Sequence, residues 1–455
     1  MISRRIDTKA MIDRRPFGSY QVWVFIMCFL AATVDGYDAI VIGAAIPGIR
    51  ETLHLQPATL GIILTAGQIG VMAGAFFLGP VSDRIGRKGM VIISACIFGL
   101  FSFLTAFATS VTAFIVLRVL AGIGMGGIVP AVLACATEYA PQRLKATIVA
   151  LVWMALPVGG MIAGFSAVWL LPRFGWTALF ILGGLLPLVL VPFLAAILPE
   201  SLAYLGARGG DQPRMRRIAL RIDPSLPADA ELYIAEEKLP GVPLKHLFTE
   251  GRAVGTILLW IVFFLSFFLM LFFTSWIPTL IRMTTGSVSA IGTSLAMWNI
   301  GSLLATAIIG RLIDKFGYYR VLPPAFVLIA LAAWTVGFFV TAPLTVILGL
   351  IAVVGFFTGG TNSGLMALAA NSYPVSIRST GLGACYALGG RTGSMCGPLL
   401  GGILLQLNWS PSEICYVIGA PMLLGTIVLL LLRTQAAFRH DPIATERPQP
   451  AAAPA

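Results

Sequence analysis

The chain has 455 residues, of which 58% are hydrophobic and only 11% are charged, and its mean hydropathy is +0.92. A soluble domain contains about 25% charged residues, so this composition excludes an ordinary soluble protein. The net charge of +11 would suit a nucleic-acid-binding protein, but the positions of the basic residues indicate membrane topology instead.

Apolar runs of about 20 residues, the length at which a helix crosses a bilayer, recur along the whole chain. The runs are continuous rather than alternating, which argues against a membrane β-barrel. The first run is too long and too polar at its centre for a cleaved signal peptide. The sequence therefore predicts an all-α polytopic membrane protein with twelve transmembrane helices, at 20–45, 58–80, 90–109, 112–136, 146–170, 176–197, 254–280, 290–310, 321–341, 343–368, 379–405 and 412–432.

The first predicted span contains Asp35-Gly36-Tyr37-Asp38, and no other charged residue lies in 20–46. Carboxylates inside a membrane are costly and commonly mark an ion or substrate path. Asp35 and Asp38 are three positions apart, so they lie on one helix face. We expect this pair to take part in transport, with protons as the coupled ion.

A charged segment after the second span has a counterpart in the second half of the chain. Asp83 lies in the first copy and Asp314 in the second, 231 positions later, and Pro47 and Pro278 are also 231 apart. A constant offset indicates internal duplication. We therefore expect two pseudo-symmetric six-helix bundles, an architecture of transporters that bind substrate near the membrane midplane.

The fourth predicted span contains Arg118 in the half of the membrane where Asp38 is expected. A contact between them would lower the cost of inserting both charges. The pair may be read in two ways: as a static ion pair, or as a site that exchanges a proton when its surroundings change. Glu138, at the end of this span, is a further candidate for proton coupling.

The polar stretch 198–252 separates the first six spans from the last six. The two termini then lie on one side, which carries 25 of the 30 Lys and Arg residues, against 3 on the other side. This asymmetry places both termini in the cytoplasm. We divide the chain into a cytoplasmic N-terminal segment, the N-terminal bundle, a cytoplasmic central loop, the C-terminal bundle and a cytoplasmic tail, at 1–19, 20–197, 198–252, 253–433 and 434–455.

Arg391 lies about 12 residues into the eleventh span, and no acidic residue lies near the middle of the last six spans. Its planar guanidinium suits a carboxylate, which belongs either to Asp35 or Asp38, or to the substrate. Aromatic and amide side chains supply candidates for the rest of a binding pocket, although each could instead pack helices or face lipid. These candidates are Tyr37, Gln68, Trp298, Asn299, Asn362 and Tyr386.

Several motifs together resemble the major facilitator superfamily over nearly the whole chain. They are Asp83-Arg84-x-Gly86-Arg87-Lys88 after span 2, Arg118-x-x-x-Gly122-x-Gly124 in span 4 and Pro199-Glu200-Ser201 after span 6. Within the superfamily, the chain resembles the aromatic acid:proton symporters in four features: Asp-Gly-Tyr-Asp in span 1, Glu138, Arg378, and Arg391-x-Gly393-x-x-x-Gly397-Pro398. Some of those symporters have a histidine in span 8, where this chain has Trp298-Asn299, so the substrate within the class stays open.

The resemblance implies a proton-coupled carrier that imports small organic anions, chiefly aromatic carboxylates, across a bacterial inner membrane by alternating access. The charges at the helix ends would form a conformational latch that pairs in only one state; its members are Asp83, Arg84, Arg87, Lys88 and Arg378. We expect the partners to be the organic anion, the proton and the lipid bilayer, and the protein to be a monomer that binds no nucleic acid.

No Walker motif occurs, so we expect no cofactor and a proton gradient as the driving force. The cysteines have no C-x-x-C spacing, and His54, His246 and His440 lie outside the spans, so we expect no metal site. No nucleophile–base pair suggests an enzyme. The alternatives are another carrier of the same superfamily, for a sugar, a dicarboxylate or an exported metabolite or drug, and a non-transporting membrane sensor or enzyme.

Overall fold

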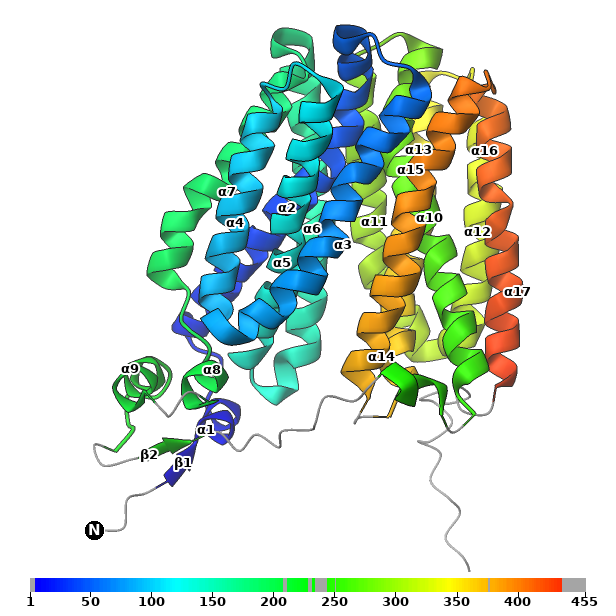
Figure 1. Cartoon of the computed structure of the whole chain (residues 1–455). Helices are drawn as coiled ribbons and strands as arrows, with labels where there is room; N and C mark the ends of the chain where they lie inside the picture. The colour runs from blue at the N-terminus through cyan, green and yellow to red at the C-terminus, as the bar shows by residue number, and fades with distance from the viewer. Residues whose placement is uncertain are drawn as a thin grey trace, which may run out of the picture. The chain divides into compact units, whose positions relative to one another are not determined.

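The computed structural model describes residues 5–207, 211–227, 231–233, 244–249, 251–374 and 377–435, without the side chains of residues 5, 80, 83, 146, 203, 207, 378 and 379. Long helices dominate the described part (Figure 1). The first half contains α2 (Ser19–Leu53), α3 (Pro57–Ile85), α4 (Arg87–Thr105), α5 (Val111–Glu138), α6 (Lys145–Phe174) and α7 (Thr177–Ile197). The second half contains α10 (Ala253–Thr285), α11 (Ser289–Phe316), α12 (Tyr318–Phe338), α13 (Leu344–Ser372), α14 (Arg378–Ala384), α15 (Arg391–Gln406), α16 (Pro411–Gly419) and α17 (Pro421–Thr434).

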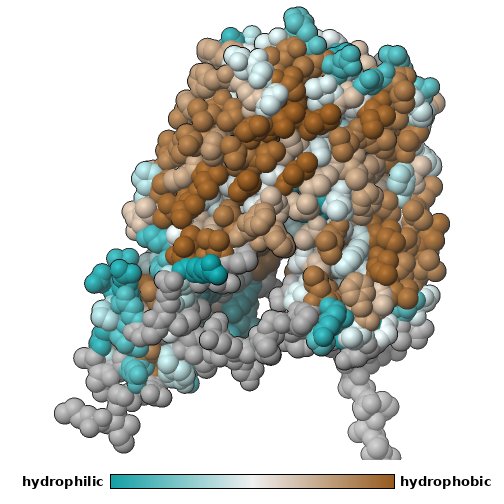
Figure 2. Space-filling model, viewed as in Figure 1, coloured by the Kyte–Doolittle hydropathy of each residue, from teal (hydrophilic) through white to brown (hydrophobic). Residues whose placement is uncertain are grey.

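The predicted all-α polytopic fold is confirmed. In the described part of the chain, 11 helical segments are long and apolar enough to cross a membrane, with α16 and α17 counted together. The remaining predicted span, 379–405, consists of α14, a π-helical segment at Cys385–Gly390 and α15, which follow one another directly. The π-helical segment divides this span into pieces that are each shorter than a bilayer-crossing helix. Apolar side chains cover the sides of the long helices (Figure 2).

The helices cluster into two compact units. Unit 1 comprises Met1–Val41, Ala66–Ala163 and Arg173–Lys238, and unit 2 comprises Ile42–Thr65, Gly164–Pro172 and Leu239–Ala455. In unit 1, α4 packs against α5 and α7. In unit 2, α10 packs against α15 and α17, and α11 packs against α13.

Glycines of α5 allow close packing against two neighbouring helices. A Cβ atom built on Gly126 would lie 2.3 Å from the carbonyl oxygen of Val71 in α3. A Cβ atom built on Gly124 would lie 2.5 Å from the backbone nitrogen of Phe98 in α4. Both separations are far below van der Waals contact, so only glycine permits the backbones to approach this closely.

Contacts within unit 2 join residues at equivalent positions of the duplicated halves. The guanidinium of Arg282 lies 3.0 Å from the carboxylate of Glu51, and these residues are 231 positions apart. A Cβ atom on Gly43 would lie 2.4 Å from the carbonyl oxygen of Thr274, also 231 positions away. Equivalent residues of a repeat touch each other only near the symmetry axis, so these contacts support the duplication inferred from the sequence.

A small layer of structure lies at the end of unit 1 where α2 begins. Strand β1 (Arg5–Asp7) pairs in parallel with β2 (Glu231–Tyr233). Strand β1 contacts α1 (Thr8–Arg14), and β2 contacts α9 (Gln212–Ile222), which in turn contacts α8 (Leu202–Ala207). Short 3-10 helices lie at Gln142–Leu144 in unit 1 and Leu244–Phe248 in unit 2.

Polar contacts fix the N-terminal segment in this layer. The Arg15 guanidinium lies 2.6 Å from the carboxylate of Asp223, and the Asp13 carboxylate accepts a 2.6 Å hydrogen bond from the backbone of Gln142. Partial burial raises the pKa of Asp223, but hydrogen bonds from Ser225 and Arg15 outweigh it and hold this pKa below its ordinary value of 3.8. The N-terminal segment and the central loop thus fold together.

Candidate functional site

A buried ion pair joins the first and fourth predicted spans. The Arg118 guanidinium donates to both carboxylate oxygens of Asp38, at 3.1 Å and 2.6 Å. The side chain of Arg118 is 3% exposed and that of Asp38 is fully buried. The bidentate geometry is the strongest way for an arginine to compensate a carboxylate in an apolar surrounding. The expected pairing of these two residues is therefore present in the structure.

Ser102 of α4 completes the coordination of Asp38. Its hydroxyl donates a 2.6 Å hydrogen bond to the same oxygen that takes the longer contact from Arg118, and Ser102 is fully buried. A short hydrogen bond to a buried carboxylate is worth more than one between neutral groups. Sequence reasoning missed Ser102, because a serine in an apolar span more often bonds its own helix.

Aromatic rings enclose this pair. The Arg118 guanidinium carbon lies 5.5 Å from the centroid of Phe180 in α7, a cation–π distance. Tyr37 is 1% exposed, and its hydroxyl donates to the carbonyl oxygen of Leu179 at 3.4 Å. A Cβ atom on Gly183 would lie 3.1 Å from the Tyr37 ring and 3.8 Å from the Asp38 carboxylate. The Asp38–Arg118 ion pair is thus surrounded by closely packed side chains of unit 1.

Asp35 lies one helical turn before Asp38 and is 8% exposed. Beside it, α2 and α6 touch through their backbones, because a Cβ atom on Gly36 would lie 2.2 Å from the carbonyl oxygen of Leu156. Gln68 is half-buried on α3, next to Gly67, whose Cβ would lie 3.7 Å from the Arg118 guanidinium. The two carboxylates of α2 therefore lie where α2 meets α4, α5, α6 and α7.

Tyr386 lies within the π-helical segment of unit 2, and Arg391 directly follows it. The guanidinium carbon of Arg391 lies 4.7 Å from the Tyr386 ring centroid, and both residues are half-buried. The edge of Tyr386 meets Phe267 of α10 with ring centroids 5.4 Å apart. π-Helical segments occur frequently at functional sites, since the extra residue re-aims side chains. The arrangement places a cation over the Tyr386 ring, which itself packs against Phe267.

A polar pair lies in the same unit. Ser266, adjacent to Phe267 in α10, donates a 2.8 Å hydrogen bond to the amide oxygen of Asn362 in α13. The amide nitrogen of Asn362 donates to the sulfur of Met270, a weak acceptor, at 3.0 Å. Asn362 thus holds an amide donor on a weak partner.

The two predicted substrate-binding candidates of α11, Trp298 and Asn299, are both buried. Trp298 is 3% exposed, with its ring centroid 5.8 Å from that of Phe273. Asn299 is 4% exposed, and its amide donates to the carbonyl oxygen of Leu295 one turn earlier at 2.8 Å. Both side chains lie in the packed interior of unit 2.

The predicted latch segment is organised around Glu200. Its carboxylate accepts a 3.2 Å hydrogen bond from the backbone nitrogen of Lys88 in the first turn of α4, a favourable position for an anion. Gly86 precedes this helix with φ +92°, and a Cβ atom there would meet the Glu200 carboxylate at 2.4 Å. Ser201 donates to Glu138 at 2.8 Å, so Glu138 belongs to this cluster at the helix ends.

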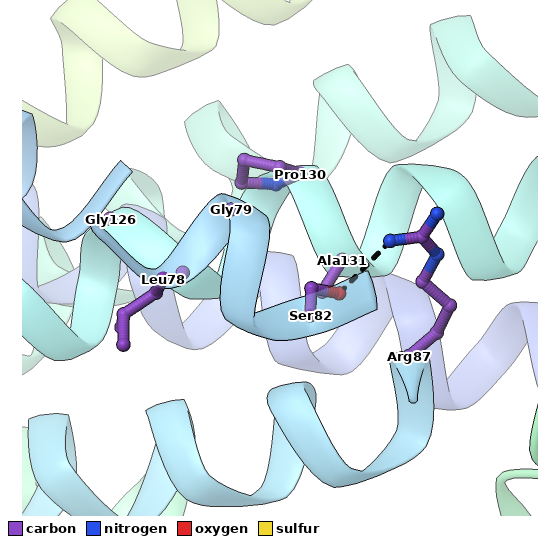
Figure 3. A pocket seen from close by; sticks show the side chains of 8 residues that line it. Leu78, Gly79, Ser82, Arg87, Gly126, Pro130 and Ala131 are labelled. Atoms are coloured by element: carbon purple, nitrogen blue, oxygen red, sulfur yellow. Dashed lines mark hydrogen bonds between the residues drawn. The ribbon is translucent and has the colours of Figure 1, made fainter. Parts of the chain in front are cut away.

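The other latch residues lie close by. Arg87 of α4 donates to the Ser82 hydroxyl at 3.1 Å beside a small pocket that residues of α3 and α5 also line (Figure 3). The backbone carbonyl of Arg84 accepts from the Tyr204 hydroxyl at 3.0 Å. The side chains of Asp83 and Arg378 lie outside the described part of the structure.

Comparison with known proteins adds the family context. The family model described as Major Facilitator Superfamily matches residues 28–286 and 281–454. The chain is 33% identical to the 4-hydroxybenzoate transporter PcaK of Pseudomonas aeruginosa, over 94% of this chain and 96% of that protein. It is 30% identical to a gallate transporter of Pseudomonas putida, over 97% and 98%. Among solved structures, that of a D-xylose-proton symporter matches with TM-score 0.72 and 17% identity, over 90% of this chain and 97% of the other.

Proposed function

Because the chain belongs to the major facilitator superfamily, we propose that it is a proton-coupled secondary transporter that imports small aromatic carboxylates by alternating access. Its relatives are named as transporters, so the protein is a multi-pass membrane carrier and not an enzyme. The relatives named for 4-hydroxybenzoate, gallate and benzoate support aromatic acids as the substrate class.

The proposed carboxylate contact is Arg391. Its guanidinium lies 4.7 Å from the Tyr386 ring, with Phe267 beyond it. A benzoate-type anion combines a carboxylate with a flat ring, so one cation beside aromatic side chains can bind both parts. Sugars lack the carboxylate, and dicarboxylates lack the ring, so this arrangement favours an aromatic acid over either alternative.

Asn362 is the proposed contact for a hydroxyl group on the substrate ring. Among the described residues, its amide bonds Ser266 and the sulfur of Met270, and a stronger partner can replace the sulfur. A site built to hydrogen-bond a hydroxyl discriminates well against an analogue without it, because its polar group is then left unsatisfied. Tyr37 and Gln68 in unit 1, and Trp298 and Asn299 in unit 2, stay predicted substrate contacts.

The observation that carries the coupling proposal is the buried Asp38–Arg118 pair with Ser102. A carboxylate in such a place can exchange a proton if a conformational change alters its partners. Asp35, one turn away, is the second candidate on the same helix face. Glu138 is the third, at the helix-end cluster with Ser201.

We assign the segment Asp83–Lys88, with Arg378, to a latch that stabilises one conformational state. Glu200 at the start of α4 supports this role, since a contact between helix ends is able to form and break as helices move. We further propose that the protein works as a monomer in the bacterial inner membrane, with both termini in the cytoplasm and a proton gradient as its energy source.

Uptake by purified protein in liposomes tests the proposal. Labelled 4-hydroxybenzoate should accumulate when the outside is acidic, and a protonophore should abolish accumulation. Xylose and succinate should not be taken up. Equal uptake with and without a pH gradient would reject the proposed proton coupling but would still agree with a carrier. Uptake of xylose or succinate but no aromatic acid would reject the substrate class.

A further inference from the structure

Helix α9 has two distinct faces. Met215 and Ala219 are fully buried, and Ile218 and Ile222 pack against the core of unit 1. Arg217, Leu220 and Arg221 point away from that core and are exposed. We call these three residues, spaced to share one side of the helix, the basic face of α9. The apolar side of the helix is thus used for folding, and the basic face is left for another role.

The basic face is not neutralised by acidic side chains. Asp211 pairs with Arg214, and Asp223 pairs with Arg15. Within the described residues, no carboxylate lies at ion-pair distance from Arg217 or Arg221. The positive charge of this face is therefore free to attract an anionic partner.

The surroundings of α9 place it at the level of a membrane surface. The Arg221 guanidinium carbon lies 5.6 Å from the ring of Tyr20, in the first turn of the spanning helix α2. Trp23, in the next turn, is 54% exposed. Tyrosine and tryptophan are enriched where a spanning helix leaves the hydrocarbon. Arg221 therefore lies at the headgroup level.

The orientation of α9 agrees with this placement. In Figure 1 it is viewed almost end-on, whereas the spanning helices of unit 1 run up the page, so α9 lies across their direction. In Figure 2 a hydrophilic patch occupies this place, next to the apolar sides of the unit 1 helices. A helix that lies across the spans at headgroup level is parallel to the membrane plane.

We propose that the basic face of α9 binds anionic phospholipid headgroups of the adjacent leaflet. Arginine is suited to this because its guanidinium binds phosphate in a bidentate manner. Leu220, 37% exposed between the two arginines, can contact the glycerol region beneath the headgroups. Such binding would attach the central loop to the membrane next to α2, the helix that carries Asp35 and Asp38.

Hydrogen–deuterium exchange of the full-length protein in lipid nanodiscs tests the inference. Peptides covering residues 212–222 should exchange more slowly in discs with 30% phosphatidylglycerol than in pure phosphatidylcholine. Two arginines near an anionic surface should favour binding of the segment to the anionic discs over the neutral discs by about 30-fold. The double variant Arg217→Gln/Arg221→Gln should therefore exchange at the same rate in both discs. Salt at 0.5 M should also remove the difference, because it screens surface charges.

The controls separate this effect from others. Arg173→Gln, an exposed arginine at the far end of α6, should behave like the wild type. The single variant Arg217→Glu, which leaves the Arg221–Tyr20 contact intact, should also lose the difference. Equal exchange of the wild-type segment in both discs would overturn the inference. Slower exchange in phosphatidylcholine discs on addition of inorganic phosphate alone would overturn it in favour of a soluble anion.

Discussion

Replacing Asp38 with asparagine should uncouple transport and also destabilise unit 1. Arg118, 3% exposed, would keep its charge but lose both contacts to an anion. Removing one partner of a buried ion pair costs about 3–5 kcal/mol, because the remaining charge is left uncompensated. Ser102→Ala removes only one hydrogen bond to the carboxylate, for a smaller loss of about 1.5–3 kcal/mol.

The double variant Asp38→Asn/Arg118→Gln separates the structural role from the transport role. It replaces the ion pair with two neutral amides that can still hydrogen-bond each other. Because no buried charge is orphaned, we expect it to recover at least half of the stability that Asp38→Asn loses. It should not recover accumulation of substrate against a pH gradient, since an amide cannot exchange a proton.

Two measurements on the same preparations check this reasoning. Denaturation in one fixed detergent should show that the wild type is the most stable, the double variant is intermediate and Asp38→Asn is the least stable. Uptake in liposomes gives the coupling, and exchange of labelled for unlabelled substrate reports whether the carrier still cycles. A double variant as unstable as Asp38→Asn would refute the orphaned-charge explanation. Normal pH-driven accumulation by Asp38→Asn would show that another group carries the proton, with Asp35 as the next to test.

Four further outcomes are expected. Arg391→Lys keeps the charge but loses the planar fork, so calorimetry should show weaker binding of 4-hydroxybenzoate; unchanged affinity would exclude the direct contact. Asn362→Leu should lower uptake of 4-hydroxybenzoate relative to benzoate, and an unchanged ratio would remove Asn362 from the ring-hydroxyl site. Gly36→Ala should cost about 1–3 kcal/mol through overpacking, since its Cβ would lie 2.2 Å from a carbonyl oxygen; Gly79→Ala, with nothing within 4 Å, is the control expected to be near neutral. Because the pKa of Asp223 is lowered, its contribution to stability is present above the ordinary value and is lost as the pH falls through the folded-state value; the hydrogen-exchange protection of residues 8–14, measured relative to the unstructured chain at the same pH, should therefore fall on acidification in the wild type, whereas Asp223→Asn should already show low protection at pH 7.

The sequence by itself determined the class of protein, the spans, the internal repeat and the charged residues of interest. The reason is that a bilayer restricts the possible structures: an apolar run of about 20 residues must form a helix whose backbone groups hydrogen-bond one another. A charged residue inside such a helix is costly, so it commonly has a functional role. The pairing of Asp38 with Arg118 was predictable for the same reason, since each residue is the other's nearest expected compensation.

Only the tertiary structure decided which neighbours complete these sites. Ser102 reaches Asp38 and Glu200 reaches the start of α4, and both contacts depend on how separate helices are rotated and packed. The π-helical segment beside Arg391 could not be predicted from the sequence either, because the residues Cys385–Gly390 have the composition of an ordinary apolar helix. Periodicity and charge report on one helix at a time, whereas these features arise from side chains that meet across helices far apart in the chain.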